Sequence, residues 1–236
     1  MVHLGSTPGG GTNNKYITLY GIIMVKCFMK LCNFKFEQDR ILAEIMHWTK
    51  SARQPKPVKA QSFSLTTVRE CVNDANYKFT RFQGITTRDA TGVRRTPDGV
   101  LDSDIIHWPV ILQDSYMKEV GDKIAAFLEM PSYRTRCSFI SAGEQAYPYP
   151  FHNDEHTPFR VHLALLTTPE TNWLFKNNSN EIAIHQPADG VPSLIDTGSV
   201  QHSFFVPANT IRIHFWYQYY QPVKQDILDK LIGISC

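Results

Sequence analysis

Residues 211–220 read IRIHFWYQYY, and residues 159–167 read FRVHLALLT. Both runs alternate side chains of two kinds, which is the period of an extended strand with two different faces. In the later run, Ile211, Ile213 and Phe215 share one face, whereas Arg212, His214 and Trp216 share the other. Arg160 and His162 lie on the polar face of the earlier run. Each run therefore predicts a β-strand with one apolar and one polar face.

Shorter runs of strand character surround these two. Pro, Gly, Asn and Asp separate them, and such spacing is typical of an antiparallel sandwich or barrel. The expected strands are residues 137–140, 181–185, 193–196 and 202–206. Apolar residues at three- and four-residue spacing predict flanking helices over residues 36–49 and 112–129, and a short helix over 223–233. The fold class that follows is mainly β with flanking helices.

The N-terminal residues differ in composition from the rest. Residues 6–14 read STPGGGTNN, which is a flexible composition without core residues. We therefore expect residues 1–28 to form a flexible N-terminal extension, with Met29 as an alternative natural start. The remainder is expected to form a single globular domain, in which residues 29–132 are an α/β support region.

Composition excludes several classes of protein. The chain has 236 residues, 42% of them hydrophobic, and a net charge of +2, so it is neither globally disordered nor a polycation. It has no apolar run of 18 residues, so no membrane-spanning helix is expected. The five cysteines are scattered and odd in number. That pattern suggests reduced thiols and a cytoplasmic location.

Positive charge is concentrated in residues 50–95. Ten Lys or Arg residues stand there against three acidic residues. The segment is either a solvated face or a docking surface for an anionic partner. In the second case, a nucleic-acid-binding module is an alternative function.

His152 and Asp154 could form part of a metal site. Residues two apart in a strand point to the same side, so the imidazole and the carboxylate can lie together. A third ligand from a neighbouring strand, such as His202, would complete a two-histidine, one-carboxylate face, the arrangement of non-haem Fe(II) oxygenases. Taken singly, His152 could instead be an ordinary loop histidine, and His202 a core histidine.

Arg212 and Arg160 pose a problem of buried charge. A guanidinium that points into a small barrel is costly unless an anion meets it, and a carboxylate is its natural partner. Two such arginines near a metal face suggest a receptor for a small dicarboxylate. Alternatively, acidic residues of the chain neutralise them, and Asp196 is one available partner.

Two long stretches show a family resemblance. Residues 137–175 read CSFISAGEQAYPYPFHNDEHTPFRVHLALLTTPETNWLF, and residues 184–216 read IHQPADGVPSLIDTGSVQHSFFVPANTIRIHFW. Together they resemble the aspartyl/asparaginyl β-hydroxylases, a branch of the cupin-like Fe(II)- and 2-oxoglutarate-dependent oxygenases. The resemblance covers about residues 133–222. It implies a double-stranded β-helix (jelly-roll) catalytic core there. The residues after this core, 223–236, are expected to form a C-terminal helix.

The resemblance also implies roles for individual residues. His152, Asp154 and His202 look like the iron ligands. Arg212 looks like the arginine that holds the far carboxylate of 2-oxoglutarate, while Ser138, Arg160 and His162 match residues near this cosubstrate. His214 and Trp216 are expected close behind these groups, and His156 could compete as a ligand. The segment AYPYPFH before His152 is about two residues longer than the family pattern.

The activity implied is hydroxylation of a C–H bond with Fe(II), 2-oxoglutarate and O2, yielding succinate and CO2 as co-products. The substrate expected is an amino-acid-like small molecule or a peptidyl side chain, without a membrane partner. The alternative is a cupin-like metal-binding protein that does not turn over. The oligomeric state does not follow from the sequence.

Overall fold

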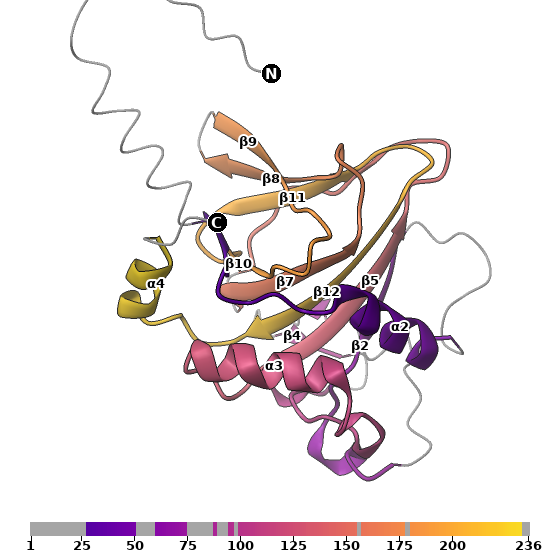
Figure 1. The fold of residues 1–236 in the computed structure, drawn as a ribbon, viewed down its shortest axis with the longest axis vertical. Coiled ribbons are helices and arrows are strands. Elements are labelled where there is room, and N and C mark those ends of the chain that lie inside the picture. The colour runs from indigo at the N-terminus through magenta and orange to yellow at the C-terminus, as the bar shows by residue number, and fades with distance from the viewer. Residues whose placement is uncertain are drawn as a thin grey trace, which may run out of the picture.

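The structure is a computed structural model that describes residues 27–50, 60–74, 87–88, 94–96, 99–154, 157–177 and 180–232. Two antiparallel sheets dominate it (Figure 1). The six-stranded sheet comprises β1 (Phe28–Lys30), β2 (Ala60–Ser64), β5 (Arg134–Ser141), β7 (Phe159–Leu166), β10 (Ser193–Asp196) and β12 (Ile211–Tyr219). The four-stranded sheet comprises β6 (Tyr147–Pro148), β8 (Asn172–Asn177), β9 (Asn180–His185) and β11 (Gln201–Val206). A separate pair joins β3 (Thr87–Arg88) to β4 (Arg94–Arg95).

The strand order confirms the predicted jelly-roll. The larger sheet runs β1-β10-β7-β12-β5-β2, and the smaller runs β6-β11-β8-β9. From β5 to β12 the chain thus passes back and forth between four strands of each sheet, which is the double-sheet arrangement of a jelly-roll. Trp173 and Phe204 of the smaller sheet share an apolar cluster with Ile140 and Ile195 of the larger one. The two sheets therefore pack face to face.

Three helices cover the outer face of the larger sheet or its edge (Figure 1). They are α2 (Gln38–Trp48), α3 (Tyr116–Phe127) and α4 (Gln225–Ile232), close to the predicted ranges. α3 starts later than predicted because Ser115 caps it, accepting a hydrogen bond from the backbone N–H of Lys118, and Val110–Leu112 form a separate 3-10 turn. None of the described helices is long and apolar enough to cross a bilayer.

The two faces of β12 carry side chains of different character. From Ile213 onward, its odd-numbered residues pack with the helices in the main core cluster: Ile213, Phe215, Tyr217 and Tyr219. Its even-numbered residues lie on the opposite face and are also buried: Arg212, His214, Trp216 and Gln218. Of these, Arg212 and His214 contact the rings of Trp173 and Phe204 on the smaller sheet. The predicted alternation thus separates a core that stabilises the fold from an interior that can hold a polar ligand.

The N-terminal region completes the larger sheet. Phe28 of β1 pairs with Ile195, and Phe63 of β2 pairs with Cys137. The ring of Phe28 also packs edge-on against Phe175, at 6.1 Å between centroids. Apart from residues 27 and 28, the predicted extension lies outside the described residues.

A buried polar network ties the region before β5 to the sheet. Asp102, in the 3-10 turn Asp102–Asp104, forms an ion pair with Arg134 of β5. Gln218 Nε2 and the Tyr220 hydroxyl each donate to Asp102 Oδ2, both at 2.8 Å. A charge that is both paired and hydrogen-bonded in this way can be buried at acceptable cost.

The expectation of reduced cysteines is wrong at one position. Cys32 is disulfide-bonded, whereas Cys27, Cys71 and Cys137 carry thiols. Local spacing along the sequence could not show this, because a disulfide depends on Cα atoms that tertiary folding brings within about 7 Å.

The helix α3 lies close to the sheet at Gly121. A Cβ atom there would lie 2.6 Å from the Tyr133 hydroxyl and 2.6 Å from Tyr217 Cε1. Gly121→Ala should therefore lower the free energy of unfolding by about 1–2 kcal/mol, because overpacking outweighs the gain in helix propensity. Ala126→Ser, at an exposed position of the same helix, should change it by less than about 0.5 kcal/mol. Chemical denaturation measures both, and a Gly121→Ala variant as stable as wild type would contradict this packing.

Candidate metal centre

Two histidines meet where the chain after β6 runs beside β11. His152 and His202 form an isolated antiparallel bridge and exchange both backbone hydrogen bonds, at 3.1 and 3.0 Å between N and O. Their side chains consequently project to the same side, with ring centroids 4.3 Å apart. Residues separated by fifty positions are thus brought together by strand pairing.

Asp154 completes the cluster. Its backbone N–H donates to the Thr197 carbonyl oxygen at 2.7 Å, which fixes the turn that aims its carboxylate at the imidazoles. Asp154 Oδ2 lies 3.3 Å from His202 Nε2 and 3.7 Å from His152 Nε2. One ligand atom from each of the three residues lies within 4.8 Å of the other two. The three predicted ligands therefore converge.

The orientation of both rings suits metal binding. Nδ1 of His152 lies 3.0 Å from the Pro150 carbonyl oxygen, and Nδ1 of His202 lies 3.4 Å from that of Val200. A carbonyl at Nδ1 favours the tautomer with its proton there, so that the Nε2 lone pair is available to a metal. Burial, together with the neighbouring His202, lowers the pKa of His152, which favours the neutral form that metals require.

Arg160 forms an ion pair with the carboxylate of this cluster. Its Nη2 lies 2.7 Å from Asp154 Oδ2, in an ion pair that is mostly buried. Burial alone would raise the pKa of Asp154, yet Arg160 and the two histidines hold it well below its usual range. Of the two alternatives for Arg160, pairing with an acid of the chain is thus present in the structure, although the acid is Asp154 rather than Asp196.

Arg212 differs from Arg160 in its surroundings. It is 2% exposed and packs over the rings of Trp173 and Phe204, at 4.7 and 4.8 Å from their centroids. Among the described residues no acid forms an ion pair with it, and its Nη1 has no hydrogen-bond partner. Asp196, the suggested partner, instead accepts from the backbone N–H groups of Gly198 and Ser199. Burial lowers the pKa of Arg212 to about 9.

Further unsatisfied polar groups line the interior near Arg212. His162 stacks on Trp216 with 5.5 Å between centroids and 12° between planes, and lies 5.4 Å from His214. Both ring nitrogens of His162, Nδ1 of His214 and Nε1 of Trp216 are buried without a hydrogen-bond partner. Burial lowers the pKa of both histidines well below the usual value, so they are neutral. Such a set of buried polar atoms without partners, donors and acceptors together, is expected where a polar ligand belongs.

Ser138 is engaged with the neighbouring strand. Its hydroxyl lies 2.6 Å from that of Ser62 and donates to the Gln61 carbonyl oxygen at 3.2 Å. His156, named as a possible competing ligand, lies outside the described residues.

Sequence reasoning missed two aromatic residues of the site. The Trp173 ring lies 4.7 Å from that of His162 and 6.2 Å from that of His202, in addition to its contact with Arg212. Tyr149 stacks on Phe204 at 4.8 Å and lies edge-on to His152 at 5.0 Å, while 37% of it is exposed. Their positions depend on strand pairing, although the alternation of residues 172–177 could have placed Trp173 inward.

Two other parts of the molecule are weaker candidates for a binding site. The basic segment 50–95 falls largely outside the described residues, so nucleic-acid binding stays an untested prediction.

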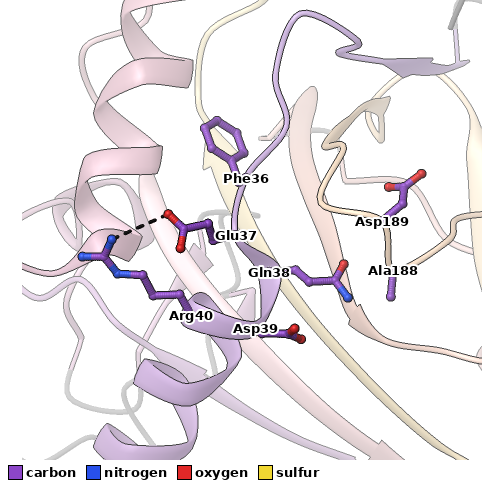
Figure 2. Close-up of a pocket in the computed structure, with 7 residues that line it drawn as sticks. All are labelled: Phe36, Glu37, Gln38, Asp39, Arg40, Ala188 and Asp189. Atoms are coloured by element: carbon purple, nitrogen blue, oxygen red, sulfur yellow. Dashed lines mark ion pairs between the residues drawn. The ribbon is translucent and has the colours of Figure 1, made fainter.

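A surface pocket of about 450 Å³ lies at the start of α2 and contains none of the candidate site residues (Figure 2). Its lining is Phe36, Glu37, Gln38, Asp39, Arg40, Ala188 and Asp189, and Arg40 pairs with Glu37 at 3.8 Å. Lys30 pairs with Asp189 at 3.8 Å, so the acidic lining is partly neutralised.

Comparison with known proteins gives distant structural matches. No family model and no curated protein sequence matches the chain. A Burkholderia pseudomallei oxidoreductase of the 2OG-Fe(II) oxygenase family is 11% identical, with 77% of this chain and 78% of that chain covered and a TM-score of 0.42. A Pseudomonas putida prolyl-4-hydroxylase is 11% identical, with 87% and 98% covered and a TM-score of 0.48. A Trichoplax adhaerens prolyl hydroxylase, solved with a hypoxia inducible factor peptide fragment, is 11% identical, with 89% and 94% covered and a TM-score of 0.48. These similarities are too low to assign an activity, which must come from the residues of this chain.

The geometry predicts which residues are needed for metal binding. His202→Ala and Asp154→Ala should each abolish saturable binding of Co(II) at micromolar concentrations, because each removes one of three converging ligands. His185→Ala is a matched control, since its Nδ1 faces the Thr171 carbonyl oxygen outside the cluster, and it should bind as wild type does. Isothermal titration calorimetry measures all four proteins. Unchanged affinity in both cluster variants would rule out this site.

Proposed function

We propose that this protein is an Fe(II)- and 2-oxoglutarate-dependent dioxygenase of the aspartyl/asparaginyl β-hydroxylase type. It hydroxylates a C–H bond of an amino-acid-like or peptidyl substrate, with succinate and CO2 as co-products. The observation that carries the proposal is the combination of three converging ligands with a buried guanidinium, that of Arg212, which no described acid neutralises.

The donor set fits Fe(II). His152 and His202 would bind through Nε2, and Asp154 through Oδ2, the atom that both Nε2 atoms approach. Two imidazoles and one carboxylate on one face leave coordination positions open, as an oxygenase requires. Bound there, Fe(II) would supply the activation of O2 that is coupled to oxidation of 2-oxoglutarate.

The interior fits a dicarboxylate. The guanidinium of Arg212 would hold the carboxylate far from the metal, and so relieve the cost of its burial. His162 and Trp216 can donate hydrogen bonds nearer the metal from nitrogens that lack partners. Ser138 and Arg160 are proposed as further cosubstrate contacts. Trp173 spans this space, since its ring contacts both His202 and Arg212.

Aromatic rings around the site exclude water. Phe204 is buried against Arg212 and Trp173, whereas Tyr149 covers Phe204 on the side toward the partly exposed His152. In such a dry interior, interactions between the fixed charges and a bound anion are stronger than in water. The substrate would reach the metal from the side of Tyr149 and His152.

The activity is tested with purified protein, Fe(II), ascorbate and 2-oxoglutarate. We expect succinate formation that requires both Fe(II) and 2-oxoglutarate and increases with a substrate found by screening amino acids and peptides. Mass spectrometry of the products should show a gain of one oxygen atom in that substrate. Metal binding without succinate formation across the screen would favour the alternative, a cupin-like protein without turnover.

Replacement of Arg212 separates cosubstrate binding from stability. Arg212→Met should raise the Kd of the Co(II)-loaded protein for 2-oxoglutarate at least about tenfold, since a charged bidentate contact is worth about 1.5–3 kcal/mol. It should not lower Tm without ligands, because it removes a buried charge that no described acid neutralises. Arg40→Met, at an exposed position of α2, should leave the Kd unchanged. An unchanged Kd in Arg212→Met would show that Arg212 does not hold the cosubstrate.

A further inference from the structure

The guanidinium of Arg160 contacts the carboxylate oxygen atom that a metal ion would bind. Asp154 Oδ2 is 2.7 Å from Arg160 Nη2, and the same atom faces Nε2 of His202 and of His152. The guanidinium and a metal ion would therefore compete for the same carboxylate oxygen. Both partners are shielded, since 12% of the Arg160 side chain and 3% of the Asp154 side chain are exposed.

A carboxylate this deeply buried needs a positive partner at all times. In the protein without metal, Arg160 provides it. A divalent cation that binds Oδ2 would take over that role and would leave two positive charges side by side. The guanidinium then needs an anion of its own, and a ligand carboxylate next to the metal can supply it.

Arg160 has the hydrogen-bonding capacity for this exchange. Apart from Asp154, its Nη2 contacts only a hydroxyl among the described residues, that of Thr157 at 3.3 Å, and its Nε is buried without a hydrogen-bond partner. A guanidinium has five N–H donors in a planar fork, so one side chain can serve first Asp154 and then an incoming carboxylate without leaving its place.

We propose that Arg160 couples metal binding to anion binding. In the metal-free protein its guanidinium neutralises Asp154 and opposes metal binding. When the metal takes the carboxylate, Arg160 passes to an anionic group of the cosubstrate, so that each ligand raises the affinity for the other. This inference rests on the proposed function, because it requires that His152, Asp154 and His202 bind a metal.

The coupling differs from a simple cosubstrate contact in one measurable respect. A residue that only binds 2-oxoglutarate does not alter the affinity for metal when 2-oxoglutarate is absent. A residue that competes with the metal lowers that affinity, so its removal makes the metal bind more tightly. Structural damage to the site would have the opposite effect.

The experiment is calorimetric titration of Co(II) into the full-length protein at constant pH, with and without saturating 2-oxoglutarate under anaerobic conditions. Arg160→Gln and Arg160→Met remove the charge, Arg160→Lys keeps it, and Arg40→Gln removes a charge outside the site. We expect both neutral variants to bind Co(II) alone more tightly than wild type, on the order of tenfold, because they remove a positive charge that repels the cation and competes for its carboxylate. They should gain less affinity from 2-oxoglutarate than wild type does.

The control variants and the neutral variants are expected to differ in their affinity for Co(II). Arg40→Gln should bind Co(II) alone much as wild type does, and Arg160→Lys, which keeps the positive charge, should bind Co(II) less tightly than the two neutral variants do. If a neutral variant is too unstable to titrate, a larger rise of its Tm on adding Co(II) than in wild type would also support the coupling. Equal or weaker Co(II) binding by the neutral variants, with no larger rise of Tm, would overturn it while leaving the metal site intact. Failure of wild type to bind Co(II) would instead overturn the proposed function.

Discussion

Charge buried between two sheets is the constraint on which the site depends. The larger sheet is covered on both faces, by helices on one side and by the smaller sheet on the other. A charged group on the inner face has little water to solvate it and must find a partner there. Asp102 forms an ion pair with Arg134, and Asp154 forms one with Arg160. Arg212 contacts aromatic rings and pairs with no acid among the described residues, so its charge can still accept an anionic ligand.

Much of this could be predicted from sequence because strand alternation is a local property. The pattern of residues 211–220 placed Arg212, His214 and Trp216 on one face, and the structure has all three buried there. The convergence of His152, Asp154 and His202 was also expected. Period alone could not provide it, and the spacing shared with a known family supplied the missing long-range information.

Features that depend on pairing between distant strands were not predictable in the same way. The alternation of FRVHLALLT turns Arg160 inward, but its acid could be identified only once the turn at Thr197 had aimed Asp154 toward it. Trp173 became part of the site because Phe204 lies directly opposite it on β11. The disulfide at Cys32 has the same origin, since bond formation requires proximity in space and not in sequence.

The first strand has a practical consequence for anyone who shortens this protein. A truncated chain that starts at Met29 would lose Phe28, and with it both a sheet pairing and a ring contact with Phe175. Phe175 is the residue directly opposite His202 on the neighbouring strand. Removal of the residues before Met29 therefore reaches, through two packing contacts, the strand that carries His202. A chain that begins one residue earlier, at Phe28, would keep that support.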